Sequence, residues 1–228
     1  MNKFFISAAT MVMLMSSCTN NDKSAQQDTF NYSVDKFADI EVLRYQVPGF
    51  EELTLQEKKL IYYLTEAALQ GRDILFDQNG KYNLAIRKTL EGIYTNYKGD
   101  KNSDEFKGLE LYLKQVWFAN GIHHHYSMDK FVPTFSEAFF AEQVKAVPAE
   151  QLPLAEGQTV DQLIETLSPV IFDPTVLAKR VNQASGVDLI TTSANNYYDG
   201  VTQAEVENFY AKMKVPGDTT PISYGLNS

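Results

Sequence analysis

The chain has 228 residues, of which 44% are apolar and 21% charged, a composition typical of a globular protein and not of a disordered or fibrous one. Its 29 acidic residues outnumber its 20 basic residues, and the net charge of −9 repels phosphate backbones, so we expect no nucleic acid partner. The single cysteine excludes an intrachain disulfide bond and any metal site built from several cysteines. Composition gives no indication of oligomeric state.

The N-terminus has the pattern of an export signal. Lys3 supplies a positive charge, and residues 4–15 form a largely apolar stretch that is too short to cross a bilayer as a helix. Two serines then precede Cys18, as in the cleavage site of a bacterial lipoprotein. We therefore predict that residues 1–17 are a signal peptide and that Cys18 carries a lipid. The alternative is an ordinary secretory signal with a chance cysteine.

This prediction places the protein in the bacterial cell envelope, as an exported lipoprotein anchored to a membrane. Residues 18–29 are polar and have nothing to bury, so they are expected to form a flexible tether. A domain then occupies residues 30–228. Its first predicted element is a strand over Ile40–Val47, which ends at Pro48 and Gly49.

Three helices are predicted in the first half of this domain. Thr54 and Glu57 form a capping box that starts the first helix, and the break at Asn79–Gly80 follows it. Its apolar residues recur at helical spacing and predict a buried stripe about four turns long. The members of this stripe are Leu60, Ile61, Leu64, Ala67, Ala68, Ile74 and Leu75. Two further helices, over residues 81–97 and 104–119, are expected to pack antiparallel to the first.

Shorter elements are predicted in the later part of the chain. Ser136 is a helix cap for a segment that reaches about Val147, and Thr159 begins another capping box. Asp173 and Pro174 together resemble a helix start. A third capping box at Thr202 opens a helix through Tyr210. The segments 189–192 and 222–224 favour strands, so the expected class is mainly α with a minor β component (α+β).

All three histidines lie in one loop, as His123, His124 and His125. Neither a helix nor a strand can turn three adjacent imidazoles toward one ion, and no spacing identifies the further ligands that zinc requires. We therefore favour a polar loop, lining a cleft or lying on the surface, over a metal site. The sequence also lacks the common hydrolase and nucleotide-binding motifs, so we assign no catalytic residue and no metal ligand.

Two aromatic segments are candidates for ligand binding. Tyr126 follows the histidines outside any helical stripe, where an amphipathic ring is suited to meeting a ligand. The run Asn195–Gly200 places polar amides beside tyrosines in a turn, and such groups can donate and accept hydrogen bonds to an extended peptide. The alternative for this second segment is simply a well-capped loop.

Three segments together resemble a known family. Residues 67–74, 117–133 and 195–202 are similar, in order and spacing, to the N-terminal region of bacterial dipeptidyl peptidase III. The resemblance covers roughly residues 40–228. It implies a two-lobed zinc metallopeptidase that releases dipeptides from the N-termini of short peptides.

The resemblance also implies that the catalytic parts lie elsewhere. The family holds zinc with an H-E-x-x-G-H helix and an E-E-x-R-A-E segment, and neither occurs in this chain. We therefore expect most of the lower, non-zinc lobe, with a β-barrel core, truncated at its C-terminus, and no zinc bound by this chain alone. In the family the loop matching residues 120–131 lines the substrate cleft, and His125 and Tyr126 fall where peptide contacts are made. The candidate peptide-binding residues are Asn120, Gly121, His123, His125, Tyr126, Asn195 and Tyr197.

Three interpretations remain open at this point. The first, which we favour, is the N-terminal part of a lipid-anchored dipeptidyl peptidase, inactive by itself. The second is a stand-alone peptide-binding lipoprotein without catalytic activity. The third is a structural surface lipoprotein whose histidines bind metal adventitiously.

Overall fold

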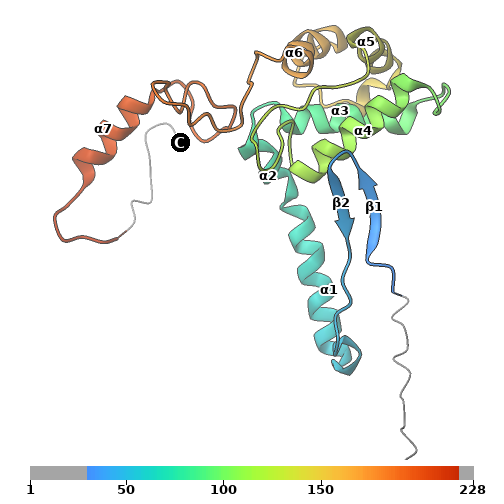
Figure 1. The fold of residues 1–228 in the computed structure, drawn as a ribbon, viewed down its shortest axis with the longest axis horizontal. Helices are drawn as coiled ribbons and strands as arrows, with labels where there is room; N and C mark the ends of the chain where they lie inside the picture. Colours follow the sequence, from blue (N-terminus) through green and yellow to red (C-terminus); the bar gives the residue numbers. More distant parts are fainter. Residues whose placement is uncertain (1–29, 221–228) are drawn as a thin grey trace, which may run out of the picture.

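The structure, a computed structural model, describes residues 30–220. The predicted signal peptide, the tether with Cys18, and the predicted strand at 222–224 lie outside the described residues. Within the described range the chain is mainly helical and has one two-stranded sheet, which confirms the α+β class (Figure 1). In residues 30–220 we find no helix with both the length and the apolar character needed to span a bilayer.

Side-chain caps explain where most of the helices begin. In five of the seven described α-helices, a Ser or Thr oxygen accepts the backbone amide three residues further on. The predicted starts at Thr54, Ser136, Thr159 and Thr202 are therefore confirmed. The elements are β1 (Ser33–Phe37), β2 (Ile40–Leu43), η1 (Phe50–Glu52), α1 (Leu55–Gln70), α2 (Arg72–Asn79), α3 (Asn83–Asn96), α4 (Asp104–Ala119), α5 (Glu137–Ala146), η2 (Ala149–Gln151), α6 (Val160–Phe172) and α7 (Gln203–Met213).

Helices α2 to α6 form the body of the molecule (Figure 1). Helix α3 contacts α2, α4 and α5, and α5 contacts α6, so their apolar faces share one core. The predicted helices 81–97 and 104–119 are thus confirmed as α3 and α4. Fully buried side chains from four of these helices include Ile86, Leu90, Leu109, Leu113, Phe140 and Leu167. This body is the rigid support for the loops described below.

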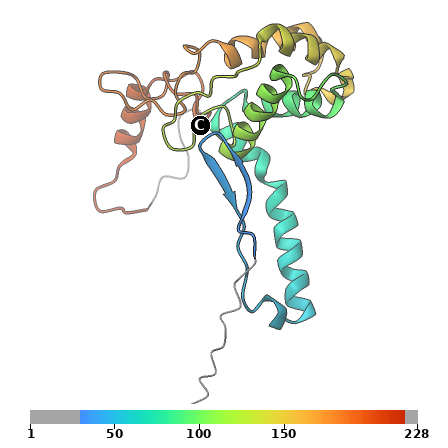
Figure 2. The ribbon, with the colours of Figure 1, turned by 45° about the vertical axis from the view of Figure 1, so that its right-hand side comes forward.

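The hairpin of β1 and β2 and helix α1 extend from the body side by side, and we call residues 33–70 the arm (Figure 1, Figure 2). The strands pair antiparallel, with Phe37 opposite Ile40 across the turn. Near the turn, Ile40 is buried and Lys114 of α4 pairs with Asp35 at 2.9 Å. The hairpin tip is therefore anchored to the body, whereas α1 has no buried residue.

The predicted burial of the first helix is wrong in the described structure. Every member of the expected stripe is exposed, including Leu60 at 58% and Ile74 at 60%. The helix also breaks at Gly71, where α1 gives way to α2, and it does not pack as one of three antiparallel helices. The apolar periodicity indicates which side chains favour burial, but no segment within residues 30–220 buries them.

The predicted strands need three corrections. The first predicted strand, β2, ends at Leu43 and not Val47, and its partner β1 was missed because its five residues include the adjacent charges Asp35 and Lys36. The segment 189–192 forms turns and no strand. The carboxylate of Asp188 accepts the amides of Ile190 and Thr191 there, which takes these groups away from any ladder.

Asp173 does not start a helix. It is the C-cap of α6, and its carboxylate accepts both the amide and the hydroxyl of Thr175 in a tight turn. Because the capping oxygen is used for this turn, residues 174–177 form turns, and a loop-rich segment leads to α7 (Figure 1).

Candidate functional site

The candidate loop, residues 120–131, begins where α4 ends in a left-handed residue. Asn120 has φ 52° and ψ 44°, and its carbonyl accepts a hydrogen bond from Asn79 at 3.0 Å. The buried side chain of Asn83 then accepts the amide of Ile122. Side chains of α2 and α3 therefore fix the start of the loop, and we call residues 120–131 the site loop.

His123 lies inside the protein. Its side chain is 2% exposed, and Nε2 donates to the carbonyl of Leu177 at 2.7 Å, while Nδ1 is buried without a partner. Burial lowers the pKa of His123 to about 4, so the ring is neutral at neutral pH. In this position His123 supports the loop from beneath and does not reach a ligand at the surface, contrary to the expectation from sequence.

His124 is the link between the site loop and the hairpin. Its Nε2 lies 3.1 Å from Oδ2 of Asp39, and its Nδ1 accepts the amides of Tyr126 and Ser127, each at 3.1 Å. The pKa of Asp39 lies below its usual value. The largest cause is a hydrogen bond from the backbone amide of Asp39 itself, and the hydrogen bond and charge of His124 add to it. Sequence reasoning missed both residues, because 85 positions separate them and no motif connects them.

His125 and Tyr126 form an aromatic cluster with Phe118 of α4, in which His125 is half-buried. The ring of His125 lies 5.1 Å from that of Phe118 and 4.4 Å from that of Tyr126, measured between centroids. Burial, followed by the charge of His124, lowers the pKa of His125. Tyr126 is 82% exposed, so its ring presents a free face to solvent. The open face of Tyr126 is chemically suited to stacking against an apolar or aromatic group.

The two candidate segments do not pair directly; residues 178–180 lie between them and form backbone hydrogen bonds with both. Phe131 donates to Ile122, Lys130 donates to Ala178, and Arg180 donates to Met128, all between backbone groups. The amides of Ala194 and Asn195 then donate to the carbonyls of Lys179 and Arg180. We call residues 122–131, 178–180 and 194–196 the three-segment strip. Sequence reasoning identified the outer segments and missed the middle one, which carries no recognisable motif.

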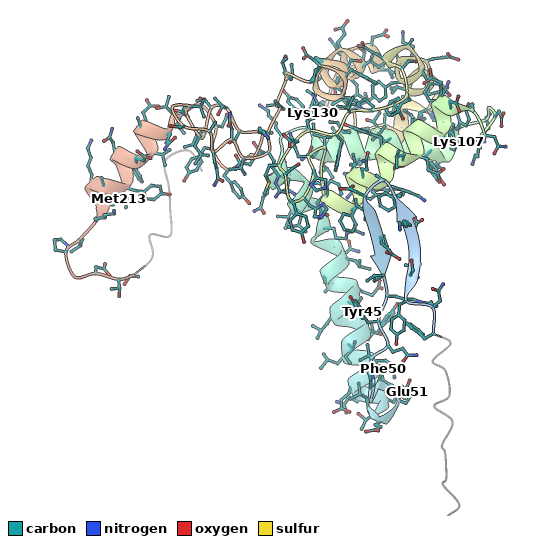
Figure 3. The ribbon with its side chains drawn as sticks, viewed as in Figure 1. Tyr45, Phe50, Glu51, Lys107, Lys130 and Met213 are labelled. Atoms are coloured by element: carbon teal, nitrogen blue, oxygen red, sulfur yellow. The ribbon has the colours of Figure 1, made fainter. Side chains whose placement is uncertain are left out.

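Beside the strip lies a cavity of about 330 Å³. Its lining is largely apolar and includes Phe131, Val132 and Phe172, together with Lys130, which is labelled in Figure 3. The ammonium of Lys130 donates to the carbonyls of Asp173 and Val176, just beyond the C-terminus of α6. Burial lowers the pKa of Lys130. The ammonium of Lys130 therefore binds the carbonyl groups that follow α6 and is not free to bind a ligand at the strip.

The histidines do not fit a zinc ion. His123 uses Nε2 on a carbonyl, and His124 uses Nε2 on Asp39 and Nδ1 on two amides. Across residues 30–220, no three His, Cys, Asp or Glu side chains lie in an arrangement that could hold a metal ion. We therefore derive no chemistry through a metal from the described part of the chain.

The remaining candidates are Asn195 and Tyr197. Asn195 is half-buried within the strip, and Tyr197 is 50% exposed just beyond it. The following amide, Asn196, donates to the carbonyl of Gln78 at the end of α2. The exposed candidates are thus Tyr126 and Tyr197, and both are carried by backbone that the body holds in place.

Comparison with known proteins gives one partial similarity. No family model matches the chain. A protein of Bacillus subtilis (strain 168) named "Putative lipoprotein YvcA" is 32% identical over 132 residues, which cover 51% of this chain and 54% of that protein. The chain therefore spans about half the length of this relative.

Proposed function

We propose that this chain is the N-terminal part of a lipid-anchored dipeptidyl peptidase of the dipeptidyl peptidase III kind, and that it supplies part of the peptide-binding cleft. The zinc and the catalytic groups are supplied by polypeptide outside this sequence. The observation that carries the proposal is the three-segment strip, because it unites the histidine loop with Asn195. An extended peptide meets exposed aromatic rings there, beside backbone held in a regular pattern.

The arm supports a cleft-forming part over a stand-alone binding protein. Residues 60–64 of α1 are five consecutive apolar residues, and successive side chains turn by about 100°, so they point in every direction around the helix. A helical segment that is apolar on every side, as this one is, is normally enclosed by other protein. The rest of the arm also has exposed apolar side chains, namely Val34, Leu43, Tyr45, Val47 and Phe50. Figure 3 labels Tyr45 and Phe50.

A two-stranded hairpin is marginally stable alone and becomes stable when further strands or a helix cover it. The arm therefore offers a place for additional polypeptide to pack, as the first interpretation requires. The third interpretation, adventitious metal binding by the histidines, receives no support, because two of the three rings are already committed to protein groups.

The membrane anchor is part of the same proposal. The similarity to a protein named as a lipoprotein agrees with the predicted lipid at Cys18 and with a location in the cell envelope. In this location the chain would encounter short peptides outside the cytoplasm. Mass spectrometry of the membrane fraction should find a diacylglycerol on Cys18, and a secreted chain without lipid would contradict this part.

Peptide binding is tested by calorimetric titration of the full chain with tetraalanine. A partial cleft should bind it with a Kd of about 1 mM or weaker, since much of the contact surface is missing. A Kd of about 1 μM or tighter, without turnover, would favour the alternative, a stand-alone peptide-binding lipoprotein. The Tyr126→Ala variant should weaken whichever binding is seen, and Tyr45→Ala, on the arm, is the matched exposed control.

The uncovered arm makes a separate prediction about stability. Replacing Leu60 of α1 with Ala should change the free energy of unfolding by less than about 0.5 kcal/mol, because the side chain contacts little protein in this chain. Replacing the fully buried Leu113 of α4 should cost about 2–5 kcal/mol. Urea unfolding of both variants measures this difference, and equal losses would show that α1 is packed in the isolated chain.

A further inference from the structure

Asp39 and His124 form a short relay that begins at the hairpin tip and ends in the backbone of the site loop. The carboxylate of Asp39 meets Nε2 of His124, and Nδ1 of the same ring meets the amides of Tyr126 and Ser127. Nε2 therefore faces a hydrogen-bond acceptor, whereas Nδ1 faces two hydrogen-bond donors. Such an arrangement fixes both the position of the ring and the place of its proton.

The chemistry allows only one neutral form of the ring. An amide N–H is a donor, so Nδ1 must offer a lone pair to Tyr126 and Ser127 and cannot carry a proton. The proton of a neutral imidazole then lies on Nε2, where it donates to Asp39. An ionised carboxylate can only accept hydrogen bonds. Asp39 therefore favours the tautomer with the proton on Nε2, in which Nδ1 is unprotonated.

We propose that Asp39 is a positioning residue of the site loop, acting through the tautomer of His124 to hold the backbone that presents Tyr126. Without the carboxylate, the Nδ1–H form becomes accessible, and this form repels both amides. The loop then loses the contacts that fix the direction of the exposed ring. The link to peptide binding rests on the proposed function, whereas the positioning of the loop does not.

The direct test is nitrogen NMR of the His124 ring in the full chain, kept in detergent because of its expected lipid. The proposal predicts a protonated Nε2 and an unprotonated Nδ1 at neutral pH, and protection of the Tyr126 and Ser127 amides from hydrogen exchange. Asp39→Ala and His124→Ala should each reduce that protection at least tenfold. Asp39→Asn should retain most of it, because its amide oxygen still accepts the Nε2 proton.

Asp35→Ala is the matched control. It removes an ion pair from the same hairpin, with Lys114 at 2.9 Å, but Asp35 makes no bond to the site loop. A protonated Nδ1 in the unaltered chain, unchanged protection in Asp39→Ala, or an equal loss in Asp35→Ala would each overturn the proposal. Absence of tetraalanine binding to the unaltered chain would instead count against the proposed function, since the tautomer and exchange results stand without it.

Discussion

Gly121→Ala should destabilise the protein by about 2–4 kcal/mol, since it combines backbone strain with a steric clash in a buried place. Gly121 has φ +151°, a region that residues with a Cβ rarely adopt. The added carbon would lie 2.9 Å from Cγ of Asn83 and closer still to its Nδ2. Asn83 is 1% exposed and holds the amide of Ile122, so it cannot move without releasing the site loop.

The control for this substitution is Gly186→Ala. Gly186 also has a positive φ, +81°, but an added Cβ would meet nothing within 4 Å. It should therefore cost only the conformational strain, about 1 kcal/mol. Urea unfolding of the two variants separates strain from clash, and equal losses would show that the contact between the loop and α3 is not tight.

His123 should make the protein less stable in mild acid. Burial lowers the pKa of His123 in the folded state from 6.5 to about 4. Between these values the unfolded chain binds a proton at this residue and the folded chain does not, so stability falls as the pH falls from 6.5. The loss levels off near pH 4, where the folded state also takes up the proton. It amounts to about 3 kcal/mol, as an order of magnitude.

This prediction is measured with His123→Gln, which can still donate to the carbonyl of Leu177 but does not titrate. Urea unfolding of both proteins from pH 7 to pH 4 gives their difference in stability at each pH. Carboxylates such as Asp129 and Asp173, whose pKa values are lowered by their hydrogen bonds, titrate in both proteins and cancel. The difference should change by about 3 kcal/mol across this range. Parallel profiles would show that the ring of His123 is accessible to protons when folded.

Local chemistry explains what the sequence could predict about the fold. A Ser or Thr at a helix start needs only the amide three residues away, so helix starts such as Ser136 and Thr159 were predictable. The same locality explains the errors. Asp173 and Asp188 carry good capping groups, but each uses its carboxylate for a turn, and the sequence alone does not show which partner is chosen.

Long-range relationships could not be predicted in the same way. The apolar pattern of α1 is genuine, yet it says nothing about which polypeptide covers the helix. The bond between Asp39 and His124 joins two turns whose separate sequences carry no signal of a contact. For the candidate site, sequence reasoning identified the exposed Tyr126 and the outer segments of the strip. It named His123 as a candidate peptide-binding residue, whereas the ring is buried beneath the loop.

The hairpin tip has a double role in this account. Its side chains anchor the arm to α4 through Asp35 and Phe37, and Asp39 contacts the site loop through His124. The uncovered apolar residues of the arm, such as Tyr45 and Phe50, lie further from the body (Figure 3). The arm therefore contacts the site loop at its tip and leaves its apolar surface uncovered further out.

The central claim is that the strip binds peptide although the catalytic groups lie outside this sequence. The most direct measurement follows backbone amide resonances of the full chain during titration with tetraalanine, with zinc present, and assays the same sample for released dialanine. The account predicts saturable shifts that concentrate in residues 122–131 and 194–197, and no hydrolysis. Shifts confined to other surfaces, or stoichiometric zinc together with release of dialanine, would contradict it.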